Sequence, residues 1–421
     1  MNKLFQFRQK ELPVFLYSSF SFFFILCSYY ILRPIRDELG IQTGTNTLPW
    51  LFSATLIAII LLNFPFSWLT QKLGRRSLLR FLFRFFTINL ILFAVCFRSF
   101  PDFVWTGRIF FVWVSVFNLF VVSIFWVLLV DLFKEEEGKR LFGMISAGGS
   151  LGAIAGSLIA VFTAEHLPHY AMILISAFFL EAATQTGFRM YDTDFGQGVS
   201  SGELDQTVLD NGSLFSGLKG LFQSPYLLNS AAYIFIYTIT SSFLYFQQIS
   251  IFETAFSSSG ERTAVLAKMD LTVNAATLFL QVFLTARIIH WIGVTGSLIV
   301  LPFLGLLGFG FLSFYPSVIF LICFQILRRI CQFAFAKPTR EILFTLVSKE
   351  DKFKAKNFMD TALYRLGDQC GAWMQTLFGW IGMNSMQISM LGVFVSALWL
   401  WNSVWLGKKE KVLSSEYKEE P

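Results

Sequence analysis

Charged side chains are scarce in this sequence, and so are the residues that hold metals or form disulfide bonds. Only 14% of the 421 residues are Asp, Glu, Lys or Arg, compared with about 25% in a typical soluble domain. The chain has three histidines, and its five cysteines include no C-x-x-C pair. We therefore predict no disulfide framework, no metal site and no cofactor.

Long apolar runs take the place of the missing charge. Hydrophobic residues make up 55% of the chain, which contains 52 phenylalanines. Runs of about 20 residues, enough to cross a hydrocarbon core of about 30 Å as a helix, recur between short polar breaks. The runs lack the alternation of barrel strands, so an all-α integral membrane protein is expected. We predict twelve transmembrane helices, over residues 14–32, 49–70, 78–97, 109–133, 140–162, 168–188, 226–250, 264–289, 294–313, 317–336, 357–383 and 387–406.

The longest break between these spans divides them six and six. It covers residues 189–225 and is rich in Gly, Ser and Asp, as expected of a linker without its own core. The predicted organisation is a six-helix half over 1–188, a linker over 189–225, a second six-helix half over 226–407 and a tail over 408–421. Two pseudo-symmetric halves of six helices resemble the plan of the major facilitator superfamily.

Lysines and arginines gather in alternate loops. The basic loops include Lys72–Arg76, Lys134–Arg140 and Lys337–Lys356, and the tail adds four lysines. By the positive-inside rule these segments and both termini are cytoplasmic. The net charge of +6 is therefore a topology signal, and we expect no binding of nucleic acid. The first apolar run exceeds the 7–15 residues of a signal peptide's hydrophobic region, so it is expected to remain as the first span.

One basic loop also resembles a superfamily motif. "SWLTQKLGRR" (67–76) is similar to the pattern G-x-L-A-D-R-x-G-R-R, with Ser67 and Gln71 in place of its Gly and Asp. The resemblance implies a gating role for Lys72, Gly74, Arg75 and Arg76, with a tight turn at Gly74. Ordinary positive-inside charge is the alternative explanation.

Glycines recur every four residues in the fifth span. Gly148, Gly152 and Gly156 share one helix face, which predicts close packing against another helix. A phosphate-binding loop is not expected, because no Gly-Lys-Ser/Thr follows a strand.

Ionisable residues within spans are the main functional candidates, since each costs about 2.5–3.5 kcal/mol or more at the membrane centre. We assign Arg80, Arg84 and Glu181 to the interface, where long side chains reach water. Asp360 and Asp368 share a helix face with Tyr364, and this cluster predicts function. The remaining members are Asp270, Arg328, Arg329 and Arg365.

The stretch "YYILRPIRDELG" (29–40) places two arginines and two acids after the first apolar run. Pro34 disfavours helical geometry at the preceding residue, so we expect the first span to end near Leu32. Arg33, Arg36 and Asp37 are then expected at the mouth of a central cavity.

Three separate segments resemble the ATP/ADP translocases of obligate intracellular bacteria and plastids. The family pattern P-T-K-E…K-x-x-x-D-x-x-x-x-R-x-G-K is similar to residues 338–368, through Pro338, Thr339, Arg340, Glu341, Lys356, Asp360, Arg365 and Gly367. Arg33, Arg36 and Asp37 match a family R-x-x-K-D. A third match runs over 123–156, through Phe125, Trp126, Asp131, Lys139, Arg140, Phe142 and Gly156.

The resemblance implies an ATP-for-ADP antiporter of a bacterial inner membrane, working as a monomer. The residues implied in substrate binding are Arg33, Arg36, Asp37, Asn118, Lys356, Asp360, Arg365 and Asp368. Arg140, Arg340 and Glu341 join the loop residues in gating.

Two departures from the translocase pattern leave the substrate open. Asp368 stands where the family has a lysine, and Ser115 or Asn118 replaces an acid. The sequence is also similar to bacterial relatives with an LRPxRDE motif, whose substrates it does not reveal. A carrier of another organic anion, with or without proton coupling, therefore stays open. A membrane enzyme is a third possibility, with "EHLPH" (165–169) as its one candidate site.

Overall fold

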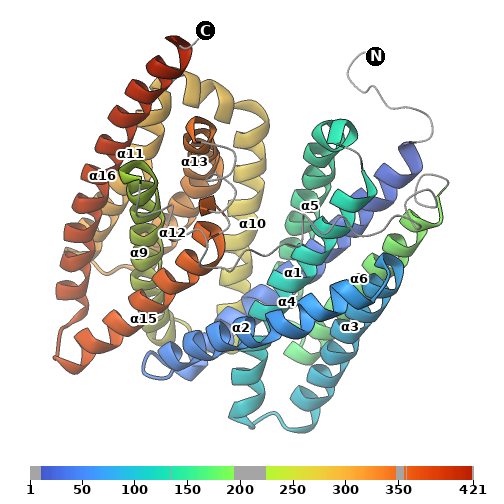
Figure 1. Cartoon of the computed structure of the whole chain (residues 1–421). Coiled ribbons are helices and arrows are strands. Elements are labelled where there is room, and N and C mark those ends of the chain that lie inside the picture. Colours follow the sequence, from blue (N-terminus) through green and yellow to red (C-terminus); the bar gives the residue numbers. More distant parts are fainter. Residues whose placement is uncertain (1–10, 134, 194–223, 348–354, 357, 420–421) are drawn as a thin grey trace. The chain divides into compact units, whose positions relative to one another are not determined.

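The computed structural model describes residues 11–133, 135–193, 224–347, 355–356 and 358–419. The regular structure of these residues is helical, and no strand occurs among them (Figure 1). The six helices of the first half are α1 (Leu12–Thr43), α2 (Leu48–Lys72), α3 (Arg75–Ser99), α4 (Val104–Leu132), α5 (Glu135–Thr163) and α6 (His169–Tyr191). The second half begins with α9 (Pro225–Ala255), α10 (Ser259–Phe283) and α11 (Thr285–Phe314).

The spans predicted for 317–336 and 357–383 contain π-helical turns. The first comprises α12 (Val318–Cys331), the π-helical turn η2 (Gln332–Ala336), α13 (Lys337–Leu343) and the 3₁₀ turn η3 (Phe344–Leu346). The second comprises the π-helical turn η4 (Met359–Leu363) and α15 (Tyr364–Trp380), and α16 (Ser385–Glu419) follows it. Turns of this kind are rare and often occur at functional sites.

Eleven helices of the described chain are long and apolar enough to cross a membrane. The expected span over 357–383 is not among them; it carries the charged residues Asp360, Arg365 and Asp368, which make it less apolar than the others. The all-α membrane fold is confirmed, and the helix count is close to the predicted twelve. Most of the predicted linker lies outside the described residues, and α16 extends beyond residue 408.

The chain forms two compact units. The described residues of Met1–Thr43, Ala54–Leu204 and Phe256–Asn274 form unit 1, and those of Gly44–Ser53, Asp205–Ala255 and Ala275–Pro421 form unit 2. Unit 1 therefore includes the N-terminal part of α10 from the second half of the chain. Unit 2 includes the N-terminal part of α2 from the first half. The division into halves at 1–188 and 226–407 stays a prediction.

The predicted end of the first span near Leu32 is wrong. α1 continues through Pro34 to Thr43, although proline removes a backbone N–H and crowds the carbonyl four residues earlier. Ile31 and Ile35 on this part of α1 are fully buried in the core of unit 1, and Leu39 is nearly so. Packing of this apolar face outweighs the local effect of the proline.

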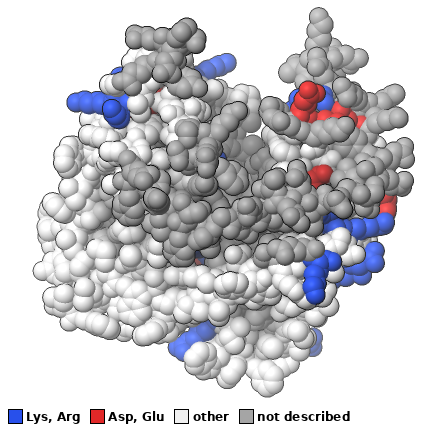
Figure 2. Space-filling view, in the orientation of Figure 1, with Lys and Arg blue, Asp and Glu red and all other residues white. Residues whose placement is uncertain are grey.

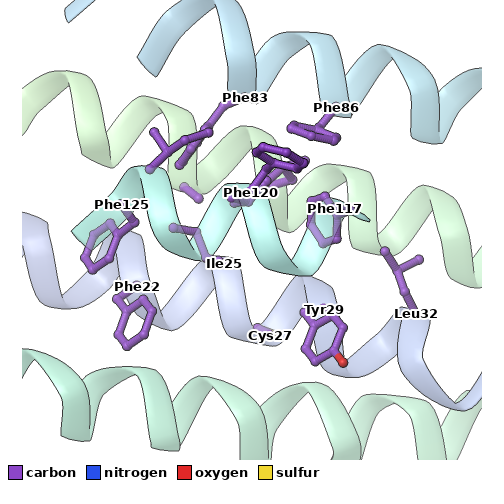
Figure 3. Close-up of a cluster of buried hydrophobic side chains, with 14 of the residues drawn as sticks. Phe22, Ile25, Cys27, Tyr29, Leu32, Phe83, Phe86, Phe117, Phe120 and Phe125 are labelled. Carbon is purple, nitrogen blue, oxygen red and sulfur yellow. The ribbon is translucent and has the colours of Figure 1, made fainter. Parts of the chain in front are cut away.

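The core of unit 1 is aromatic and joins α1, α3 and α4 (Figure 3). The ring of Phe22 on α1 stacks on that of Phe125 on α4, with centroids 4.6 Å apart and planes within 2°. Phe83 and Phe86 reach this core from α3 and are almost fully buried. Such rigid packing gives α1 a defined position beside its neighbours.

The glycine face of α5 lies against α1. A Cβ atom at Gly148 would lie 3.0 Å from the backbone oxygen of Ser19. At Gly152 and Gly156 it would collide with the backbone oxygens of Phe23 and Cys27. The two backbones can approach this closely only because these positions carry no side chain.

Gly74 of the loop motif and Gly293 of α11 have different backbone geometry. Gly74 precedes α3 at φ −59°, and a Cβ there would have no neighbour within 4 Å. Gly293 in α11 has φ +70°, in a break between two helical segments. Only the second position requires glycine for its conformation.

Large apolar side chains are exposed on many helices. Phe64, Trp291 and Ile319 each have more than 70% of their surface accessible. Figure 2 shows a face on which most described side chains are uncharged. A surface of this kind suits contact with lipid.

Candidate functional site

The first charged cluster of unit 1 joins α1 to the N-terminal part of α10. Arg33 Nη1 donates to Asp270 Oδ1 at 2.8 Å, and Arg33 Nε lies 4.0 Å from Asp37 Oδ2. The Asp270 side chain is only 4% exposed and that of Arg33 is 20% exposed. The guanidinium also lies 5.8 Å from the ring centroid of Tyr30. Arg33 is thus a largely buried cation held between two carboxylates.

Arg36 lies beside this group on the same helix. Its Nε and Nη2 donate to Asp37 Oδ1 at 3.0 and 2.6 Å. The guanidinium lies 5.5 Å from the ring centroid of Phe111 on α4. Asp37 is therefore close to both arginines, and the cluster holds two cations and two carboxylates, Asp37 and Asp270.

A second ion pair joins the same two helices. Glu38 is fully buried, and its Oε1 accepts from Arg262 Nη2 at 3.0 Å. Gln42 Nε2 donates to both Glu38 oxygens, at 2.9 and 3.1 Å. His169 Nε2 lies 4.0 Å from Glu38 Oε2, so the second histidine of "EHLPH" belongs to this contact.

The predicted site residues of unit 2 also occur in pairs. Arg340 Nη2 donates to Asp360 Oδ1 at 2.6 Å, and Lys356 Nζ donates to Glu341 Oε2 at 2.5 Å. Arg365 Nη1 lies 3.9 Å from Asp368 Oδ2. These three pairs contain six of the predicted binding and gating residues. Asn118, another predicted binding residue, is half-buried in α4.

The spacing argument for the span at 357–383 fails at its first member. Asp360 lies in the π-helical turn η4, so the α-helical spacing that groups it with Tyr364 and Asp368 begins only at Tyr364. Its carboxylate pairs with Arg340 of α13. Sequence patterns do not show a π-helical turn in advance.

The predicted gating residues of unit 1 lie at helix ends. Lys72 Nζ is 4.6 Å from the ring centroid of Trp68 within α2. Three arginines form ion pairs that link different segments of the chain. The pairs are Arg75 with Asp131 at 2.6 Å, Arg76 with Asp192 at 2.5 Å, and Arg140 with Glu11 at 3.0 Å.

Three groups were missed as partners in the sequence. Asp270 was recognised as an acid within a span, but its contact with Arg33 depends on the fold. The sequence positions of Arg262 and Glu38 likewise give no sign of their contact. All three are ionisable residues at or near a predicted span. This position marks each of them as a functional candidate but does not identify its partner. In the described part of the chain no cluster of His, Cys, Asp and Glu is suited to a metal ion.

The sequence matches the profile of the Major Facilitator Superfamily over residues 14–345. The chain belongs to the major facilitator superfamily. This major facilitator protein is 20% identical, over an alignment of 477 positions, to a protein of Chlamydia pneumoniae named ADP,ATP carrier protein 1, covering 95% of this chain and 91% of the relative. A Chlamydia trachomatis protein of the same name is also 20% identical, covering 98% and 90%.

Solved transporter structures share the fold of this major facilitator protein. The nucleoside transporter NupG aligns with a TM-score of 0.63 at 11% identity, covering 95% of this chain and 99% of that one. A D-xylose-proton symporter aligns at 0.61 and 15% identity, covering 94% and 98%. The POT family transporter PepTSo aligns at 0.65 and 11% identity, covering 98% and 99%. The protein is thus a multi-pass membrane transporter with the major facilitator fold.

Proposed function

We propose that this transporter exchanges ATP for ADP across a bacterial inner membrane by alternating access. Similarity to two chlamydial proteins named ADP,ATP carriers, over nearly the full length of each chain, supports this substrate. The observation that carries the proposal is the pair of arginines on α1, each close to a carboxylate that an anion could replace.

The arginine cluster suits a phosphate chain. A guanidinium offers a planar set of donors that matches phosphate oxygens in pairs. Arg33 and Arg36 would exchange Asp270 and Asp37 for the phosphates of the nucleotide. The carboxylates keep the cations paired at other times, which avoids an unpaired charge in a low-dielectric site. Asn118, on α4, would add a neutral polar contact.

Substrate binding would also act on the contact between helices. Release of Asp270 from Arg33 removes an ion pair between α1 and α10, and the pair of Glu38 with Arg262 remains. Coupling between binding and conformational change requires such a difference in contacts between states. In unit 2, Lys356, Asp360, Arg365 and Asp368 are also proposed to bind the substrate.

The remaining ion pairs are proposed to control access. Arg75, Arg76 and Arg140, with Lys72 and Gly74, lie at helix ends that we assign to the cytoplasmic side together with both termini. Arg340 and Glu341 have the same proposed role in unit 2. We propose that a single chain carries out transport.

A specific feature favours a second candidate. Asp368 lies 3.9 Å from Arg365 at a position where translocases have a lysine, so this region carries less positive charge than theirs. Exchange of a less charged organic anion, with a proton carried by a carboxylate of the site, is the alternative. We do not favour an enzyme, because His169 is engaged with Glu38, Thr263 and Ser259.

The test is exchange by purified protein in liposomes. Uptake of labelled ATP should require ADP trapped inside and should be lost in Arg36→Ala and Arg365→Ala. Arg84→Gln is the matched control, because it removes an arginine from a span where the side chain is 48% exposed. Uptake of another anion that needs a proton gradient would favour the alternative. Absence of flux for every anion tested would contradict both.

A further inference from the structure

Arg328 of unit 2 lies inside a span and has no carboxylate partner among the residues that the structure describes. Arg328, near the end of α12, is 5% exposed. In the described part of the chain, no carboxylate lies within ion-pair distance of its guanidinium. The arginines of the proposed site differ: Arg33, Arg36, Arg340 and Arg365 each lie within 4 Å of an Asp.

Neutral groups of α9 surround the guanidinium. Arg328 Nη1 donates to Ser241 Oγ at 2.7 Å. Its Cζ lies 5.2 Å from the ring centroid of Tyr237, a distance suited to a cation–π contact. The buried Nε has no hydrogen-bond partner in the structure. A buried guanidinium whose Nε–H is unpaired keeps unused donor capacity and an incompletely compensated loss of hydration.

The surroundings of Arg328 have unused polar capacity as well. Gln332, four residues further on in the π-helical turn η2, has a buried side-chain oxygen without a partner. The Tyr237 ring lies 6.2 Å from that of Tyr364, which begins α15 directly after the second π-helical turn. Helical irregularity, a lone cation and aromatic rings therefore come together from α9, α12 and α15.

We propose that Arg328 binds the negatively charged group of the transported solute, a phosphate or a carboxylate. Ser241 and Tyr237 position the guanidinium, and its free Nε–H donates to the anion. This inference rests on the proposed transport of an anion and names the principal cation of the site in unit 2. Arg365, by contrast, has Asp368 beside it.

This role predicts an unusual effect on stability. Replacing a residue that only supports the fold lowers the melting temperature. Replacing a buried cation that lacks a counter-ion should instead leave the melting temperature of the ligand-free protein unchanged or raise it. Bound anion should raise the melting temperature only when Arg328 is present.

The experiment is thermal unfolding of the purified full chain in detergent, without ligand and with ADP, AMP, adenosine, inorganic phosphate or citrate. Arg328→Gln should keep or raise the ligand-free melting temperature and should weaken anion binding about tenfold or more, as expected for a lost charged hydrogen bond. Arg328→Lys should keep part of the binding, because charge remains without the planar donors. Arg84→Gln should respond like the wild type.

The outcomes separate the two proposals. Wild-type stabilisation by ADP that is unchanged in Arg328→Gln would overturn the role of Arg328 and leave nucleotide transport standing. A response to phosphate or citrate alone, lost in Arg328→Gln, would support the anion site and contradict the nucleotide. A third outcome would show that Arg328 is a structural residue. In that case Arg328→Gln melts at a lower temperature than the wild type without ligand, and Arg328→Lys restores this stability but binds none of the anions. Wild-type protein without a response to any of these anions contradicts both proposals.

Discussion

At the residue scale, the contacts of Arg33 show how burial decides how much stability is lost when a charged side chain is removed. Its partner Asp270 is almost completely buried, whereas Arg33 keeps some exposure and has Asp37 4.0 Å away. The two members of this ion pair are therefore not equivalent. Loss of Arg33 leaves a buried carboxylate behind, but loss of the Asp270 charge leaves a cation that still has a carboxylate nearby.

This difference gives a testable asymmetry. Arg33→Gln should lower the unfolding free energy by about 3 kcal/mol, in the range for a buried carboxylate that loses its ion-pair partner, and Asp270→Asn should lower it by less. The double variant should be more stable than Arg33→Gln, because it removes the stranded charge. Melting temperatures of the four proteins form a double-mutant cycle that measures the coupling. If the two single variants lose equal stability and the double variant loses the sum of both, the coupling free energy of the Arg33–Asp270 pair is zero and the predicted asymmetry is wrong.

At the element scale, α5 shows how a sequence pattern becomes a helix contact. The four-residue recurrence of glycine predicts a packing face, and the structure places that face on the backbone of α1. The pattern does not identify the partner helix, because every helix backbone would accept a glycine face equally well. The end of α1 could not be predicted from Pro34 either, since the burial of Ile31 and Ile35 depends on neighbours distant in the sequence.

The α5 contact can be tested with two glycines of the same helix. Gly152→Ala should destabilise the protein by about 1–3 kcal/mol, because the added Cβ collides with the backbone oxygen of Phe23. Gly143→Ala is the matched control: its Cβ would have no neighbour within 4 Å, and alanine favours helix by about 1 kcal/mol. The melting temperature and the exchange activity should both fall in Gly152→Ala and in Gly152→Leu. Equal stability of the two alanine variants would refute close packing at Gly152.

At the scale of the whole molecule, the sequence predicts the membrane spans better than it predicts which side chains contact each other. Runs of apolar residues predict the spans, because burial in lipid acts on each segment by itself. The contact of Arg33 with Asp270 joins residues that are far apart in the sequence, and no local pattern encodes it. The sequence marks Arg328 as an ionisable residue within a span, but the lack of a carboxylate partner among the described residues depends on how the neighbouring helices pack.

The division into units leads to the last prediction. The N-terminal part of α10 packs in unit 1, where Arg33 and Glu38 of α1 form ion pairs with Asp270 and Arg262. Alternating access requires that contacts closing one side of a carrier separate in another state. If α1 and this part of α10 form such a contact, a covalent link between them should stop exchange.

Gln42 and Ser259 offer a place for this link, since Gln42 Nε2 lies 3.5 Å from Ser259 Oγ. In a background with the five native cysteines changed to serine, Gln42→Cys with Ser259→Cys should be joined by a short bifunctional methanethiosulfonate reagent, which replaces the length of the glutamine side chain and is released by reductants. Exchange in liposomes should then fall to background and return when a reductant is added. Each single cysteine variant is the control, because it has the same chemistry without the link. Full exchange by a completely cross-linked protein would show that α1 and α10 stay together through the cycle, which would place the moving contact elsewhere in the fold.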